Sequence, residues 1–297
     1  MESQKDFCTR EEDENNGFYV NLLKNPERFT GYDGEHAHKM WNAIYDENCF
    51  SDHNNLNKFQ KCEEREAFYK IISGMHTSIS THIASEYFDP FTKNWTRNSS
   101  LFWERVGKFP ERIENLQFLF SIMLRAVSKA GHYLLNYDFI TGDKVEERRT
   151  LVLLGRIVQG ARKCPFGLES SLFVEPEKKR VKGELQKYFK NISKIMNCLS
   201  CEKCRLWGKI QTQGIGTALK ILYSYKNEHS NFQLKRSEVV SLINALNRFS
   251  SSLHAISLFQ DEKQQYSTQR KEFSVFAKYI APVVVVILSI LFLIASK

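Results

Sequence analysis

The 297-residue sequence has little proline and glycine, with 6 and 14 residues respectively, and no Gly/Ser-rich or Pro-rich linker divides its main body. Alternating apolar and polar runs, which are typical of half-buried strands, are nearly absent. No internal repeat recurs at a fixed period, and no Rossmann-type glycine fingerprint is present. These absences argue against a β-sheet fold and against several separate domains.

A recognisable signal peptide is also missing, because the N-terminal residues MESQKDFCTREEDENNG are acidic and polar. Three glycosylation sequons, at Asn94, Asn98 and Asn191, nevertheless indicate the lumen of the secretory pathway. The net charge of +8 admits an anionic partner such as lipid headgroups or a phosphorylated cofactor. No basic stripe interleaved with aromatic residues is present, so nucleic-acid binding is not predicted.

The sequence does contain a succession of helical patterns. One apolar stripe at helical spacing consists of Ile72, Met75, Ile79 and Ile83. A neighbouring polar stripe consists of Ser73, His76 and Ser80. Further helices are predicted around residues 116–127, 148–163 and 214–224, and Ser237 is the predicted N-cap of a helix over residues 238–259. We therefore predict a single all-α domain over residues 1–260, followed by a polar connector over residues 261–278.

The C-terminal run from Tyr279 to Ser296 has no charged residue and lies between Lys278 and Lys297. About 18 apolar residues is the lower end of what crosses a bilayer, so we predict a transmembrane helix over residues 279–296. More positive charge precedes this run than follows it, which favours a cytosolic body by the positive-inside rule. The sequons favour a luminal body, and the sequence alone leaves this conflict open.

Seven cysteines are present: Cys8, Cys49, Cys62, Cys164, Cys198, Cys201 and Cys204. The last three stand three residues apart. A structural zinc site needs four ligands, usually in two pairs, and Cys164 is the only nearby candidate for a fourth. An iron–sulfur cluster also needs a fourth cysteine. The Cys201–Cys204 CxxC motif suits a redox pair, and a helix start lowers the thiol pKa of such a pair. Spacing alone leaves a redox, a metal and an inert structural role open.

The flanking residues narrow this choice. The segment CEKCRLWGKIQTQGIGTALKIL resembles the active-site segment of the endoplasmic reticulum oxidoreductins, which are FAD-dependent thiol oxidases that drive disulfide formation. Five upstream segments resemble the same family in its order: YVNLLKNPERFTGYDG, HKMWNAIYDENCF, REAFYKIISGMHTSIS, RIENLQFLF and LRAVSKA. The resemblance runs from about Phe7 to about Leu258. It implies an all-α fold with FAD held in the core of a helix bundle, and it implies no metal site.

The resemblance also implies a set of FAD-binding residues. They are Arg28, Thr30, Trp41, Ser73, His76, Arg105 and Arg112. The chemistry of these residue types agrees, because guanidinium groups bind a diphosphate and an indole stacks on flat rings. Ser73 and His76 are three residues apart and share one helix face.

By the same resemblance, Cys201 and Cys204 form the redox pair beside the flavin, with Cys204 nearer to the ring. Electrons then pass through FAD to oxygen, and hydrogen peroxide is the product. Cys49 and Cys62 match a structural disulfide. Cys198 matches a cysteine whose partner lies further upstream than this chain begins, and Asn191 matches a glycosylated sequon.

The match departs from the family at the N-terminus. Family members carry upstream shuttle cysteines that accept electrons from protein disulfide isomerase, whereas Cys8 is the only cysteine before Cys49 here. We expect either a fragment or alternative product, or a protein that has lost its electron entry. The predicted function is a thiol oxidase at the endoplasmic reticulum membrane, with its catalytic domain in the lumen. The alternative is a membrane-anchored flavin-binding or interaction protein without turnover.

Overall fold

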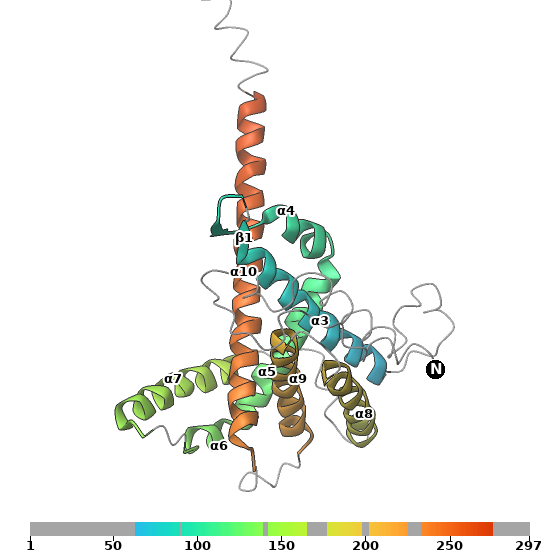
Figure 1. Ribbon diagram of the computed structural model, residues 1–297, viewed down its shortest axis with the longest axis vertical. Helices are drawn as coiled ribbons and strands as arrows, with labels where there is room; N and C mark the ends of the chain where they lie inside the picture. The colour runs from blue at the N-terminus through green and yellow to red at the C-terminus, as the bar shows by residue number, and fades with distance from the viewer. Residues whose placement is uncertain are drawn as a thin grey trace, which may run out of the picture. The chain divides into compact units, whose positions relative to one another are not determined.

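The computed structural model describes residues 63–89, 91–138, 142–164, 177–197, 202–224 and 233–275, and these are mostly helical (Figure 1). The elements in chain order are α3 (Glu63–Ser85), β1 (Tyr87–Asp89), β2 (Asn94–Thr96), α4 (Ser99–Phe102), the π-helix η2 (Trp103–Gly107), α5 (Pro110–Lys129), α6 (Gly131–Leu135), α7 (Lys144–Lys163), α8 (Glu177–Asn197), α9 (Glu202–Tyr223) and α10 (Arg236–Val275). The predicted all-α class and the predicted helices are confirmed over this part of the chain.

Helix α3 is buried on more than one face. The predicted apolar stripe is confirmed, because Ile72 and Met75 are almost fully buried and Ile79 and Ile83 are nearly so. The polar stripe beside it does not face solvent, since Ser73 is only 4% exposed. Helix α8 covers part of α3, where Phe68 stacks on the Tyr188 ring at a centroid distance of 4.6 Å. A polar face inside a core needs internal hydrogen-bond partners or a polar ligand.

Helices α3 and α5 cross closely at Gly74. A Cβ atom at this position would lie 2.5 Å from the carbonyl oxygen of Asn115 and 3.1 Å from the Cα of Leu116. No side chain larger than hydrogen fits without moving the α5 backbone. The crossing therefore brings Ser73 and His76, which lie before and after Gly74 on α3, close to the first half of α5.

The first part of α10 is joined to α3 by polar contacts. The Ser252 and Ser78 hydroxyls lie 2.7 Å apart, and an Arg248 guanidinium nitrogen lies 2.7 Å from Nδ1 of His82. Burial, followed by the charge of Arg248, lowers the pKa of His82 to about 4. A neutral imidazole accepts at Nδ1 from Arg248, so the N–H of the ring is at Nε2, which lies 3.4 Å from the Glu86 carboxylate. Because the ring is uncharged at neutral pH, this contact is not a salt bridge there.

The predicted N-cap of this helix is wrong by about two residues, because α10 begins at Arg236. The Glu238 carboxylate accepts the backbone N–H of Lys235 at 2.8 Å, which is the reach-back half of a capping box. Ser237 instead accepts a hydrogen bond from the Gln213 side chain at 3.2 Å. The Ser237 hydroxyl therefore contacts Gln213 of α9 and does not cap α10.

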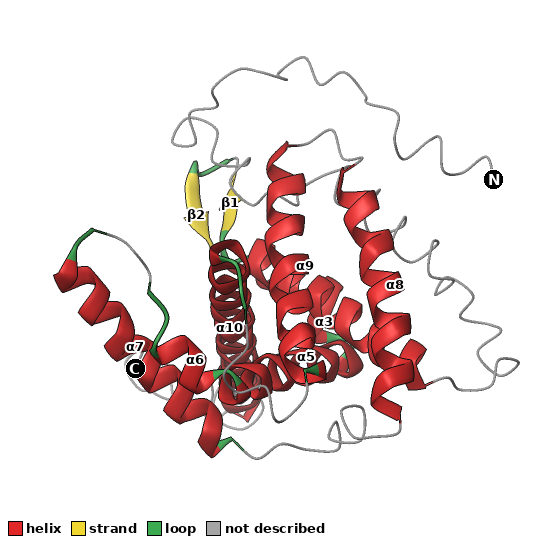
Figure 2. Ribbon diagram, turned by 90° about the horizontal axis from the view of Figure 1, so that it is seen from below, coloured by secondary structure: helices red, strands yellow, loops and turns green. Residues whose placement is uncertain are grey.

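A short antiparallel hairpin was not predicted from the sequence, and α4, η2, α6 and α8 were likewise not among the predicted helices. Strands β1 and β2 pair from Tyr87 with Thr96 to Asp89 with Asn94 (Figure 2). The Asp89 carboxylate accepts from the Phe91 N–H at 2.8 Å and from the Thr92 hydroxyl at 2.9 Å, which holds the turn. Strands of three residues are too short to show an alternating pattern.

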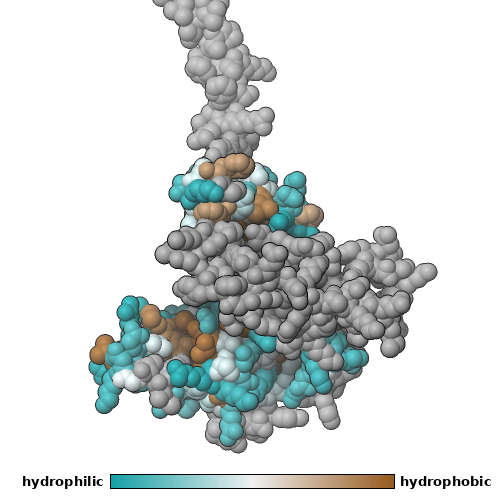
Figure 3. All heavy atoms as spheres, viewed as in Figure 1, coloured by the Kyte–Doolittle hydropathy of each residue, from teal (hydrophilic) through white to brown (hydrophobic). Residues whose placement is uncertain are grey.

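Helices α8 and α9 lie side by side, and α9 also packs against α5 (Figure 2). Exposed apolar side chains occur on α7, where Val145, Val152 and Leu153 are 78%, 52% and 49% exposed, and apolar residues are visible there among hydrophilic ones (Figure 3). The hairpin carries two more, Phe91 and Trp95.

The chain divides into two units, Met1–Leu253 and His254–Lys297, and the division falls within α10. Helix α10 continues to Val275, so most of the predicted connector is helical. None of the helices in the described ranges has the length and apolar character needed to span a bilayer. The predicted transmembrane helix over residues 279–296 lies outside the described residues, and the predicted domain boundaries stay predictions.

Candidate functional site

Four of the predicted cofactor-binding residues come from the region where α3, η2 and α5 meet. Ser73 and His76 lie on α3, Arg105 on η2, and Arg112 on α5. Ser73 is buried, His76 and Arg112 are half-buried, and Arg105 is exposed. Residues that are distant in sequence are therefore arranged from the core outwards.

The charges of both arginines act on the imidazole of His76. Burial is the main cause that lowers its pKa from 6.5 to about 3, and the charges of Arg112 and then Arg105 lower it further. Part of the side chain stays accessible, yet the imidazole is desolvated enough to remain neutral at neutral pH. Both guanidinium groups thus act on His76, and a group of two cations beside a neutral imidazole suits an anionic ligand.

Local contacts position Arg112. Its guanidinium carbon lies 4.1 Å from the centre of the Phe109 ring, a cation–π distance, and its Nη1 donates to the carbonyl oxygen of Arg105. Pro110 stands in the first turn of α5, where its missing N–H has no intrahelical partner to lose. The preceding π-helical turn, η2, is a rare element that is frequent at functional sites.

Asn115 is a site residue that the sequence did not reveal. Its Nδ2 donates to the Ser73 hydroxyl oxygen at 3.0 Å, and the Asn115 side chain is buried. Because that oxygen accepts from Asn115, the Ser73 hydroxyl proton is available to donate elsewhere. The position of Asn115 in the sequence, one helical turn after Arg112, could have indicated a place in the site. In the structure Asn115 lies opposite Gly74.

The CxxC motif lies at the start of α9. The helix begins at Glu202, directly after Cys201, and Cys204 lies in its first turn. This agrees with the helix-start interpretation, in which the partial positive charge of the helix N-terminus favours a thiolate. The Cys201 residue and the Cys204 side chain lie outside the described residues, so their assignment as a redox pair stays a prediction.

Further along α9, two polar side chains are buried. Gln211 is 2% exposed and Thr212 is 5% exposed. The Gln211 Oε1 and the Thr212 hydroxyl oxygen form no hydrogen bond with any described residue. Buried polar atoms normally have a partner, so these two unpaired oxygen atoms on the helix that carries Cys204 fit a polar ligand such as FAD.

The remaining predicted site residues lie outside the described residues and stay predictions. They are Arg28, Thr30, Trp41, Cys49, Cys62 and Cys198. Within the described ranges, no group of three or more His, Cys, Asp or Glu side chains gathers as a metal site would require. The Cys164 thiol, at the end of α7, is free and half-buried.

The three predicted glycosylation sites differ in their surroundings. Asn94 is exposed on β2. Asn98 caps α4, because its Oδ1 accepts the Leu101 N–H at 2.9 Å, which leaves its Nδ2 available. Asn191 is half-buried within α8. Exposure therefore favours Asn94 as the acceptor among these three, and glycosylation of each stays a prediction.

Comparison with known proteins agrees with this architecture. Residues 1–256 match the family model described as Endoplasmic Reticulum Oxidoreductin 1. The chain is 44% identical over 243 residues to endoplasmic reticulum oxidoreductin-2 of Arabidopsis thaliana, covering 79% of this chain and 51% of that relative. It is 37% identical over 303 residues to the human ERO1-like protein alpha, covering 88% of this chain and 65% of that protein.

A solved structure of Ero1p, described as a source of disulfide bonds for oxidative protein folding in the cell, has the same fold. Its TM-score is 0.68 at 32% identity, over 84% of this chain and 66% of that one. The chain thus spans about half the length of the Arabidopsis relative and less than two thirds of the human one. The predicted resemblance is confirmed: the chain belongs to the endoplasmic reticulum oxidoreductin family.

Proposed function

We propose that the protein is an FAD-dependent thiol oxidase that drives disulfide formation in the endoplasmic reticulum. The observation that carries this proposal is the grouping of Ser73, His76, Arg105 and Arg112 where α3, η2 and α5 meet, in a member of the oxidoreductin family. A half-buried and an exposed guanidinium group beside a neutral imidazole and a buried hydroxyl suit a ligand that joins a diphosphate to polar rings.

The residues present fit FAD. Arg105 and Arg112 supply donors for its diphosphate, and Ser73 supplies a hydroxyl that Asn115 already orients. His76 is kept uncharged by burial, and a neutral imidazole carries one donor and one acceptor. By resemblance, Arg28, Thr30 and Trp41 complete the set. When bound, FAD supplies an acceptor for two electrons that oxygen can reoxidise, with hydrogen peroxide as product.

Cys201 and Cys204 carry the thiol chemistry. A substrate dithiol reduces their disulfide by two exchange steps, in each of which a thiolate attacks one sulfur and releases another. The substrate leaves as a disulfide, and the two cysteines each gain a thiol proton. The pair then gives up two electrons and two protons to become a disulfide again. The net reaction converts a dithiol and oxygen to a disulfide and hydrogen peroxide. The start of α9 assists by stabilising a thiolate.

The proposed partner is protein disulfide isomerase, which presents reduced thiols. The hairpin offers one surface for contact, because Phe91 is 93% exposed and Trp95 is 45% exposed. Aromatic side chains that protrude from a short, braced hairpin suit insertion into an apolar pocket of a partner. The proposed location is the membrane of the endoplasmic reticulum, with the body in the lumen and residues 279–296 as the anchor.

Oxygen consumption with a small dithiol tests this function directly. The chain should bind FAD, and it should consume oxygen when dithiothreitol is added. A protein that binds FAD without consuming oxygen would support the alternative of a flavin-binding protein without turnover. A folded, colourless protein that FAD cannot reconstitute would refute the cofactor assignment.

A further inference from the structure

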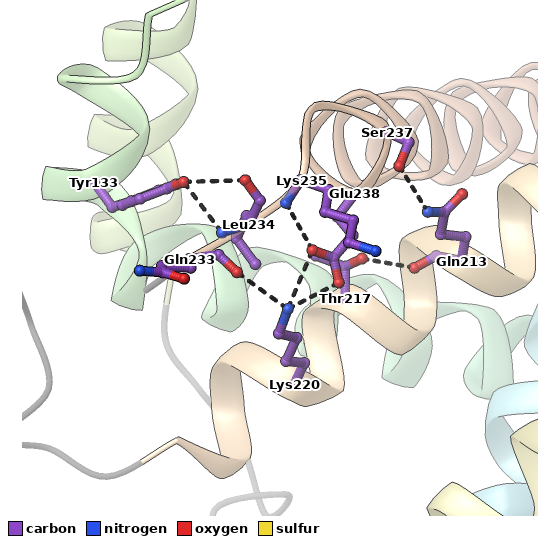
Figure 4. Close-up of polar contacts among 9 residues, drawn as sticks. All are labelled: Tyr133, Gln213, Thr217, Lys220, Gln233, Leu234, Lys235, Ser237 and Glu238. Carbon is purple, nitrogen blue, oxygen red and sulfur yellow. Dashed lines mark hydrogen bonds and ion pairs between the residues drawn. The ribbon is translucent and has the colours of Figure 1, made fainter. Parts of the chain in front are cut away.

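Helix α9 carries two glutamines, two residues apart, with opposite surroundings. Gln213 is exposed and well partnered. Its Nε2 donates to the Ser237 hydroxyl at 3.2 Å (Figure 4), and its Oε1 accepts from the Ser241 hydroxyl at 3.1 Å. Gln211 is 2% exposed, and its Oε1 accepts no hydrogen bond from any residue in the described part of the chain. An unsatisfied buried polar atom destabilises the folded protein, so the Gln211 amide lowers stability unless a ligand pairs with it.

The position of Gln211 on α9 indicates which ligand would pair with its amide. An α-helix turns by about 100° per residue, so seven residues bring position 211 to within about 20° of position 204. Gly208 lies between them on this face and is also buried. Residue 213 lies on nearly the opposite face. The buried amide therefore follows the redox cysteine along α9, and Thr212 adds a second buried oxygen beside it.

We propose that Gln211 is a further flavin-binding residue, whose side-chain amide pairs with the pyrimidine edge of the isoalloxazine ring. This inference rests on the proposed FAD-dependent function. The unpartnered Gln211 atom is an acceptor and needs a donor. The oxidised ring has a single N–H, at N3, and a carbonyl on each side of it. A primary amide is complementary to this edge, because it presents an acceptor beside a donor.

Paired substitutions separate a ligand contact from a structural one. Gln211→Leu, of similar volume, removes an unsatisfied polar group, so the melting temperature of the flavin-free protein should rise by a few degrees. Its affinity for FAD should fall about tenfold or more. Gln213→Leu should do the reverse, lowering the melting temperature because Ser237 and Ser241 lose a partner, with unchanged FAD affinity. Gln211→Met serves as a second variant if the leucine does not fold.

A flavin analogue identifies the part of FAD that is contacted. FAD methylated at N3 cannot donate to Gln211, so the parent protein should bind it about tenfold less tightly than FAD, and Gln211→Leu should bind both alike. An equal loss for both proteins would overturn the ring assignment. A lower flavin-free melting temperature with unchanged FAD affinity in Gln211→Leu would make Gln211 structural and overturn the inference alone. A parent protein that binds no FAD would overturn the proposed function as well.

Discussion

Arg112 is the residue for which the flavin proposal makes the sharpest prediction. Its guanidinium is held over Phe109 and hydrogen-bonded to the η2 backbone, which orients its remaining donors. Arg112→Ala should weaken FAD binding by about ten- to a hundredfold, as expected for a lost charge-assisted contact to phosphate. Fluorescence titration of FAD into the flavin-free protein measures this. Arg162→Ala, an exposed position on α7, is the control, and equal losses in both variants would contradict the assignment.

The low pKa of His76 predicts that the stability of the flavin-free protein depends on pH. The unfolded chain binds a proton at His76 below pH 6.5, whereas the folded chain does so only below about 3. Between these values the unfolded state holds more protons, so stability is present above pH 6.5 and is lost as pH falls. By pH 5 the free energy of unfolding should drop by about 2 kcal/mol from this residue. His82 acts in the same direction.

Denaturant unfolding at pH 7 and pH 5 tests the contribution of His76. His76→Gln should remove roughly half of the pH-dependent loss that the two buried histidines cause, and His132→Gln, at an exposed position, should leave the loss unchanged. A pH dependence in His76→Gln identical to that of the parent would show that His76 is not held neutral in the folded protein.

At the scale of elements, the crossing of α3 and α5 determines whether the site forms. Gly74→Ala places a Cβ atom 2.5 Å from the Asn115 carbonyl oxygen, so the helices must separate. We expect a loss of about 1–3 kcal/mol in unfolding free energy, together with weaker FAD binding. Gly160→Ala on α7 meets no atom within 4 Å and should be neutral or slightly stabilising. Melting curves of both variants measure this, and equal stability would argue against the close crossing.

Substitutions in the hairpin are expected to weaken binding to the partner protein and to leave the stability of this chain nearly unchanged. Phe91→Ser removes an almost fully exposed aromatic group, so the melting temperature should change little. Trp95→Ser also removes a ring contact with Phe88 at 5.4 Å, so its melting temperature should fall slightly. Binding to reduced protein disulfide isomerase should weaken about tenfold, as expected when an anchoring aromatic residue is lost. Calorimetric titration measures it. Val240→Ser, 46% exposed on α10, is the control, and unaffected binding in both hairpin variants would move the contact elsewhere.

The elements also show what the sequence could and could not predict. The α3 stripe at Ile72, Met75, Ile79 and Ile83 was predictable, because helical spacing of apolar residues reports a buried face. Burial of Ser73 beside it was not, because it depends on which helix packs there. The hairpin was too short to predict. Ser237 failed as a cap because its preference was outweighed by a tertiary contact with Gln213.

For the whole molecule, the family was predictable from long motifs. Four of the predicted cofactor-binding residues, Ser73, His76, Arg105 and Arg112, lie on elements that meet, and their role in binding FAD stays a prediction. Asn115 and Gln211 were not predicted, since an amide in a helix carries no periodic signal of its role. Only the three-dimensional surroundings distinguish the buried Gln211 from the exposed Gln213. The sequence motif QTQ presents the two glutamines as equivalent, and packing makes them different.

We propose that the chain passes electrons from a dithiol through Cys201 and Cys204 to flavin and oxygen. Oxygen consumption with dithiothreitol, measured on flavin-loaded protein, is the decisive test. We expect consumption by the parent and by Cys164→Ser, whose free thiol lies outside the proposed pair. We expect loss of consumption in Cys204→Ser, with FAD still bound, because the pair carries electrons and does not hold the cofactor. A Cys204→Ser protein that consumes oxygen at the parent rate would contradict this proposal.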